Sequence, residues 1–162
     1  MNLATNIQQN LLENDDGLAS ASLPVAHRGN ADEHLKGVCE IAAEMFDVAL
    51  ACIVLHRPGE GWQVISGGRL ALHPLPAEMS LSLEALASDQ PLIVSDTRKR
   101  LGGYRSRGEP GWRMRFFAAI PFTLEHGRAA ICLLDRGVRD LPERCRLKLE
   151  NLAGIASGLR VH

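Results

Sequence analysis

The sequence predicts an α+β protein built around an antiparallel sheet that is covered on both faces. Two pairs of short apolar runs are each joined by a polar turn containing glycine, which is typical of β-hairpins. The strands of these pairs are apolar at consecutive positions, so both of their faces need cover. Helical periodicity is clearest toward the two ends of the main domain. With 162 residues, of which 46% are hydrophobic, the chain has the size of one domain with a proper core.

A helix is expected near the start of this domain, from Asn30 to Asp47. Its apolar side chains follow the i, i+3, i+4, i+7 spacing of one helix face; they are Leu35, Val38, Cys39, Ala42, Met45 and Phe46. Residues 1–29 are expected to be an N-terminal helix with one narrow apolar stripe, followed by a linker rich in Gly, Ala, Ser and Pro. Residues 30–162 are expected to form the domain itself.

A second long helix is expected after Asp140, with Pro142 in its first turn. Its apolar residues are spaced four, three, four and three apart: Cys145, Leu149, Leu152, Ala156 and Leu159. This heptad-like seam is typical of contact between helices, so we expect it to form a dimer interface. Leu147 and Ile155 lie off the seam and are candidates for facing the sheet.

Four of the expected strands form two hairpins, residues 48–66 and 115–134. Because both faces of the second hairpin are apolar, we expect it to lie in the middle of the sheet, with layers on both sides. Between the hairpins we expect a less regular excursion. It holds a short helix near residues 83–87, a short strand at 91–94, and a loop with four glycines at 102–112.

Composition argues against several classes of protein. The formal net charge is −1, so no overall imbalance points to nucleic acid or a membrane surface. No apolar run approaches the ~20 residues that span a bilayer, and no signal peptide opens the chain. Four scattered cysteines lie in apolar-patterned segments without a C-x-x-C pair: Cys39, Cys52, Cys132 and Cys145. We expect them to be reduced core residues of a cytoplasmic protein.

Three short sequence motifs, taken with the order of the expected elements, allow comparison with a known family. They are "PLIVSDT" (Pro91 to Thr97), "RFFAAIPF" (Arg115 to Phe122) and "GRAAICLLD" (Gly127 to Asp135). With them, the chain resembles a GAF domain over roughly residues 32–159. The resemblance implies an antiparallel sheet of about five or six strands, with the terminal helices on one face. The irregular excursion would cover a small-molecule pocket on the other face. GAF domains bind cyclic nucleotides, linear tetrapyrroles, haem, or amino or keto acids. Many are sensory and dimerise through their terminal helices.

Signatures of three GAF groups are missing from the sequence. Members that hold a linear tetrapyrrole (bilin) covalently carry a cysteine in the excursion, often beside a histidine. No cysteine lies between Arg69 and Arg115, and no Cys-His dipeptide occurs. The same absence argues against a free methionine sulfoxide reductase. The N-K-x-F-x-x-x-D-E signature of cyclic-nucleotide binders is also absent. We therefore expect no cofactor and no covalent bilin.

A cationic stretch runs from Arg98 to Arg115 and holds seven Lys or Arg residues, with Glu109 as its one acid. In a GAF-like arrangement it would lie over the pocket, where guanidinium groups suit a carboxylate or phosphate ligand. The candidate ligand-binding residues are Arg98, Tyr104, Trp112, Arg115, Phe117, His73 and Asp96. The alternative interpretation is a solvated loop with scattered charges. Nucleic-acid binding is disfavoured because the patch is local.

Arg115 opens a strand that is expected to enter the core. A buried charge without a partner is strongly destabilising, so Arg115 must lie at the strand end or be paired. Asp96 and Asp135 are the plausible partners. Two interpretations stay open: Arg115 braces the edge of the sheet, or it anchors a ligand at the mouth of the pocket. Residues 95–101 are expected to begin another short helix, with Ser95 or Asp96 as its N-cap.

No motif predicts catalysis or a metal site. The histidines lack metal-ligand spacing, and no nucleophile elbow, P-loop or H-E-x-x-H motif is present. We therefore expect no catalytic residue and no metal. The function that the sequence favours is a cytoplasmic, dimeric sensory domain that binds a small, anionic molecule and signals through an effector protein. The alternatives are an adaptor that binds no ligand and, less favoured, an unrecognised enzyme.

Overall fold

The protein is described by a computed structural model that covers residues 28–68, 76–100 and 114–158. The elements in chain order are α3 (Arg28–Phe46), β1 (Leu50–Arg57), β2 (Gly61–Gly67), α4 (Pro76–Ser88), β3 (Leu92–Val94), α5 (Thr97–Arg100), β4 (Phe116–Leu124), β5 (Gly127–Asp135) and α6 (Glu143–Gly158). Helix α3 begins two residues before the expected domain boundary at residue 30. Helix α4 begins seven residues before the helix expected near 83–87. Within the described ranges, no helix is long and apolar enough to cross a bilayer.

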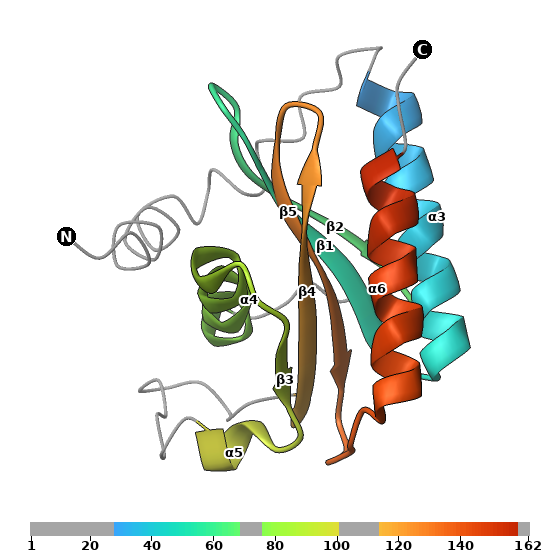
Figure 1. Cartoon of the computed structure of the whole chain (residues 1–162), viewed down its shortest axis with the longest axis vertical. Helices are drawn as coiled ribbons and strands as arrows, with labels where there is room; N and C mark the ends of the chain where they lie inside the picture. Colours follow the sequence, from blue (N-terminus) through green and yellow to red (C-terminus); the bar gives the residue numbers. More distant parts are fainter. Residues whose placement is uncertain (1–27, 69–75, 101–113, 159–162) are drawn as a thin grey trace, which may run out of the picture.

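The strands form one antiparallel sheet in the order β2-β1-β5-β4-β3. Helices α3 and α6 lie side by side on one face of this sheet, and α4 covers the other (Figure 1). Strand β5 lies at the centre and β4 beside it, which confirms the expectation for the second hairpin. The expected α+β fold, with five strands and helices on both faces, is therefore confirmed.

Strict alternation along the central strands supplies two separate apolar clusters. In β1, Ala51, Ile53 and Leu55 belong to the cluster beneath α3 and α6. Their neighbours Cys52 and Val54 belong to the cluster beneath α4. All are buried, because successive side chains of a strand point to opposite faces and both faces are covered.

Two glycines allow close approach of backbone to backbone. A Cβ at Gly67 in β2 would lie 2.8 Å from the backbone nitrogen of Glu40, so a side chain there would push α3 off the sheet. A Cβ at Gly127, where β5 begins, would collide with the carbonyl oxygen of His56 in β1. Both positions therefore depend on the missing Cβ rather than on an unusual backbone angle.

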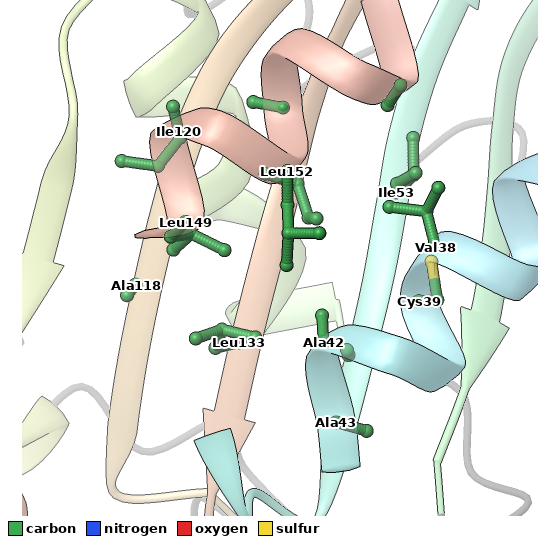
Figure 2. Close-up of a cluster of buried hydrophobic side chains, with 14 of the residues drawn as sticks. Val38, Cys39, Ala42, Ala43, Ile53, Ala118, Ile120, Leu133, Leu149 and Leu152 are labelled. Carbon is green, nitrogen blue, oxygen red and sulfur yellow. The ribbon is translucent and has the colours of Figure 1, made fainter. Parts of the chain in front are cut away.

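The apolar seam of α6 faces inward, which corrects the predicted dimer interface. Leu149, Leu152 and Ala156 are buried against α3 and the sheet (Figure 2). Cys145 packs on the same cluster, and Leu159 lies outside the described residues. The seam thus packs on the sheet and on α3 of its own chain, because heptad spacing does not reveal which element or which chain the seam contacts.

The residues expected to face the sheet point outward instead. The exposed fractions of Leu147 and Ile155 are 50% and 57%. On α3, Met45 is 50% exposed, although its spacing grouped it with the buried residues, and Ile41 is 52% exposed. The helix layer therefore has an apolar inner side and a partly apolar outer side. Self-association through the terminal helices stays a prediction, but the seam is not the surface for it.

Two leucines of α6 provide a matched test of this arrangement. Leu149→Ala is expected to lower the free energy of unfolding by about 2–5 kcal/mol, because it leaves a cavity among fully buried neighbours. Leu147→Ala, two residues away on the same helix, should change it by less than about 0.5 kcal/mol. Urea unfolding followed by circular dichroism measures both values. Equal losses from the two variants would contradict the described orientation of α6.

Candidate functional site

The candidate site lies on the α4 side of the sheet, where the GAF resemblance places a pocket. Alternate residues of the three central strands face α4 there, and all are buried: Leu50, Cys52, Val54, Phe117, Ala119, Ala130, Cys132 and Leu134. Helix α4 places Met79, Leu83 and Leu86 against them, and Met114 approaches from the segment before β4. Within the described residues, this face is therefore lined almost entirely by the protein's own apolar side chains.

One polar pair lies within this apolar layer. The Ser82 hydroxyl of α4 lies 3.3 Å from the Cys132 sulfur at the centre of β5. Each gives the other a hydrogen-bonding partner, which a buried hydroxyl requires. Cys52 lies opposite Cys132 on the neighbouring strand, and both are free thiols. No sequence motif predicts this pair, although alternation along β5 places Cys132 and Leu134 on one face.

Cys39 lies on the opposite side of the sheet and is equally enclosed. Burial raises the pKa of the Cys39 thiol to about 12, so it stays protonated at neutral pH. Its sulfur donates to the backbone oxygen of Ile65 in β2 at 3.6 Å. Cys39, Cys52 and Cys132 are buried and Cys145 is half-buried, as expected for free thiols used as core residues.

Charged groups meet at the edge of the α4 side, where β3 passes into α5. The Arg115 Nη2 atom donates to Asp96 Oδ2 at 3.0 Å. The Asp96 side chain is 11% exposed, whereas that of Arg115 is 34% exposed. The other Asp96 oxygen accepts the backbone N–H of Arg98 at 3.1 Å, which is the helix N-cap contact that the sequence predicted.

These contacts set the charge state of Asp96. Partial desolvation raises the pKa of the Asp96 carboxyl, but the hydrogen bond from the Arg98 N–H and the pairing with Arg115 outweigh it. The net result is that the pKa of Asp96 lies below its ordinary value, so the carboxylate is charged at neutral pH. The Asp96–Arg115 contact is therefore a true ion pair.

The backbone of Arg115 is fixed on both sides. Its N–H donates to the Asp135 carbonyl at the end of β5 at 2.8 Å, and its carbonyl accepts the Thr97 N–H at 2.7 Å. The Thr97 hydroxyl donates in turn to the Met114 carbonyl at 3.0 Å. Arg115 thus stands one residue before β4, tied to both β5 and α5. The Nε atom of Arg115 is buried, and within the part of the chain that the structure describes it has no hydrogen-bonding partner.

Asp135, the other expected partner of Arg115, uses its carboxylate elsewhere. Its Oδ2 atom accepts from Arg139 Nη1 at 3.1 Å. The same Arg139 nitrogen donates to the Asp47 carbonyl just past the end of α3, and the guanidinium lies 5.6 Å from the centre of the Phe116 ring. A second bridge thus joins the sheet end to the helix layer. Spacing along the sequence gave no signal for Arg139.

Comparison with known proteins rests on structure. No protein-family model matches the sequence, and no curated protein does. The GAF domain of the Acinetobacter phosphoenolpyruvate-protein phosphotransferase superposes with a TM-score of 0.57 at 13% identity, over 98% of this chain and 92% of that one. GAF3 from Slr1393 of Synechocystis sp. PCC6803, in its photoproduct state, gives 0.58 at 11% identity, over 79% and 91%. The chain has a GAF-like fold.

A third similar structure is the free methionine-R-sulfoxide reductase from Neisseria meningitidis, in complex with its substrate. Its TM-score is 0.55 at 14% identity, over 96% of this chain and 84% of that one. At such identities the likeness is one of architecture. The chemistry of this GAF-like domain must be argued from its own side chains.

The GAF-like domain brings together part of the predicted ligand set. Asp96 and Arg115 pair at the edge of the α4 side, and the exposed residue Arg98 follows on α5. Phe117 lies inside the apolar cluster. Tyr104, Trp112 and His73 lie outside the described residues. Within the described ranges, no group of three or more His, Cys, Asp or Glu residues is placed to hold a metal ion.

The depressed pKa of Asp96 gives a signed prediction of stability against pH. A carboxyl whose pKa is lower in the folded state stabilises the fold above its unfolded pKa of about 4, and that contribution is lost as the pH falls through the folded value. Asp96→Asn should therefore be less stable than wild type at pH 7, and the gap should close in acid. Urea unfolding at a series of pH values measures the gap. A gap that stays constant from pH 7 to strongly acidic pH would show that the ion pair does not form.

Proposed function

We propose that this protein is a sensory GAF domain that binds a small anionic molecule at the edge of the α4 side and reports it to a partner protein. The observation that carries the proposal is the state of Arg115. Its backbone is fixed by β5 and α5, Asp96 holds one terminal nitrogen, and among the described residues its buried Nε–H has no hydrogen-bonding partner. A carboxylate or phosphate oxygen would satisfy that donor.

The surroundings of Arg115 favour a negative ligand. Arg98 and Lys99 of α5 are exposed beside the ion pair, and the sequence adds further arginines between residues 100 and 113. Asp96 already neutralises one positive charge, so the excess that remains is positive. Sensory roles are suggested by similar structures, which include a GAF domain of a phosphotransferase and a GAF domain in a photoproduct state.

A signal from Arg115 has a short physical route to the helix layer. The Arg115 N–H bonds to the carbonyl of Asp135, and the Asp135 carboxylate holds Arg139. Arg139, which lies four residues before α6 begins, donates in turn to the Asp47 carbonyl beside the end of α3. A ligand that draws Arg115 toward itself would bias the packing of the terminal helices, which an effector protein can read. The free, buried thiols support a cytoplasmic setting for this exchange.

An adaptor without a ligand is the second candidate, and one observation favours it. The described side chains of α4 and the sheet already pack against one another across the candidate pocket face. A domain whose pocket is filled by its own side chains would serve through its surfaces alone. An enzymatic role is not proposed. The polar pair on this face joins a thiol and a hydroxyl, and no motif in the sequence assigns either to catalysis.

A thermal-shift titration with small carboxylates and phosphates, including nucleotides, distinguishes the two candidate functions. The sensor predicts that at least one of these anions raises the melting temperature in a saturable way, because a ligand at a hundred times its Kd adds about 2.7 kcal/mol of stability. Arg115→Gln should weaken that binding by about tenfold or more, since a charge-assisted hydrogen bond contributes about 1.5–3 kcal/mol.

Arg128→Gln is the matched control for this experiment. Arg128 is also half-exposed and also bound to an aspartate, Asp89, at 2.9 Å, but it belongs to β5 and pairs beside the end of α4. It should leave the titration unchanged. A panel that yields no saturable shift would favour the adaptor. A shift that both variants weaken equally would contradict an anion site at Arg115.

A further inference from the structure

Two cysteines face each other at the centre of the sheet. Cys52 in β1 and Cys132 in β5 are directly opposite in the register of this antiparallel pair. Both side chains belong to the apolar cluster beneath α4, so they point to the same face of the sheet. Both are almost completely buried, and neither is in a disulfide. The fold therefore makes neighbours of two thiols that are far apart in sequence.

The spacing of this pair suits a disulfide bond. Residues directly opposite each other in antiparallel strands have Cα atoms about 4.5–5.5 Å apart, and disulfides span Cα separations of about 4.4–6.8 Å. The Cβ atoms of such a pair lie about 4.5–5.5 Å apart, whereas a relaxed disulfide prefers about 3.8 Å. A small approach of β1 and β5 would allow the bond to form. The strain that remains would make it easy to reduce again.

The other two cysteines of the chain are not placed for such a bond. Cys39 belongs to the cluster on the opposite face, beneath α3 and α6, so the sheet separates it from Cys132 (Figure 2). Cys145 is half-buried on α6 and packs on that same opposite cluster. The pairing of Cys52 with Cys132 is therefore specific to the α4 side, and Cys39 provides a matched control.

Polar contacts at the Cys132 sulfur distinguish it from its neighbour. The Cys132 Sγ atom donates to the Ala130 carbonyl at 3.7 Å and lies 3.3 Å from the Ser82 hydroxyl of α4. Because a carbonyl oxygen only accepts, the thiol hydrogen points to Ala130, and the Ser82 hydroxyl donates to the sulfur. The same hydroxyl would donate more strongly to a thiolate, since hydrogen bonds to a charged acceptor are stronger. Cys132 is thus the better placed nucleophile of the two.

We infer that Cys52 and Cys132 form a reversible dithiol switch that a hydroperoxide oxidises. With hydrogen peroxide, the Cys132 thiolate attacks one oxygen: an S–O bond forms and the O–O bond breaks. The departing hydroxide takes up the proton that the thiol released, which gives water and a sulfenic acid on Cys132. The Cys52 sulfur then attacks the Cys132 sulfur, and the S–O oxygen leaves as a second water with the Cys52 proton. The two thiols lose two electrons in total, and the peroxide gains them.

Helix α4 both limits access to this pair and responds to its oxidation. It covers the face on which the two sulfurs lie, so a peroxide reaches them when the helix opens locally (Figure 1). A disulfide sulfur is a poorer partner for the Ser82 hydroxyl than a thiolate, and a buried hydroxyl without a good partner is destabilising. Oxidation should therefore loosen the packing of α4. The inference needs no ligand, so failure of the anion titration would leave it intact.

Peptide mapping by mass spectrometry tests the switch on the full, folded chain. The reduced protein is treated with hydrogen peroxide at neutral pH, catalase stops the reaction, and the remaining thiols are alkylated in denaturant. Wild type should yield a peptide crosslinked between Cys52 and Cys132, which dithiothreitol separates. Cys52→Ser should stop at the sulfenic acid of Cys132, which dimedone traps. Cys39→Ser should crosslink as wild type does, because Cys39 lies on the other face.

Two serines of α4 test the part that the helix plays. Ser82→Ala should slow formation of the crosslink by about tenfold, because the thiolate loses a charge-assisted hydrogen bond. Ser88→Ala, which removes a hydroxyl bonded only locally to the Ala85 carbonyl, should leave the rate unchanged. Circular dichroism confirms that each variant is folded. The inference is overturned if Cys52 and Cys132 both stay reduced while Cys145 is oxidised, or if the crosslink contains Cys39. Equal rates for the two serine variants would overturn the assignment of Ser82.

Discussion

Burial of both faces of the hairpin β4–β5 is the constraint on which the rest of the structure depends. Strand β5 has hydrogen-bonded neighbours on both edges and apolar side chains on both faces, so it can exist only inside three layers. The requirement brings α3 and α6 to one side and α4 to the other. It also leaves the charged groups at the start of β4 and the end of β5, Arg115 and Asp135, as polar groups next to the central strands.

The two ion pairs at that end connect different parts of the fold. Asp96 and Arg115 join the α4 side to the start of β4, whereas Asp135 and Arg139 join the end of β5 to the helix layer. The backbone hydrogen bond from the Arg115 N–H to the Asp135 carbonyl links the two pairs. The sheet end is thus one continuous polar network that joins the α4 side to the helix layer. The fold brings Arg115 within bonding distance of Asp96 and of the Asp135 carbonyl, although both are far from it in sequence.

The fold could be predicted from sequence because patterns with a period of two or 3.6 report burial directly. The doubly apolar hairpin, the helices at the ends and the pairing of Arg115 with either Asp96 or Asp135 follow from such patterns and from the cost of an unpaired buried charge, and the structure selects Asp96. The orientation of α6 could not be predicted in this way. A stripe containing Leu149 and Leu152 packs equally well on a helix of its own chain or of another, and the sequence does not say which. Ser82 could not be predicted because its partner Cys132 is distant in sequence, and Arg139 could not because the Asp47 carbonyl that it binds is also distant and its pairing with Asp135 follows no motif.

The central claim is that the Nε–H group of Arg115 donates a hydrogen bond to a bound anion. It is tested most directly by the Nε–H resonance of Arg115 in a 1H–15N spectrum, assigned by its loss in Arg115→Lys, while small carboxylates and phosphates are added. The account predicts that one of these compounds shifts this resonance in a saturable manner and leaves that of Arg128 unmoved. An Arg115 resonance that no compound shifts, or that moves only together with that of Arg128, would contradict it.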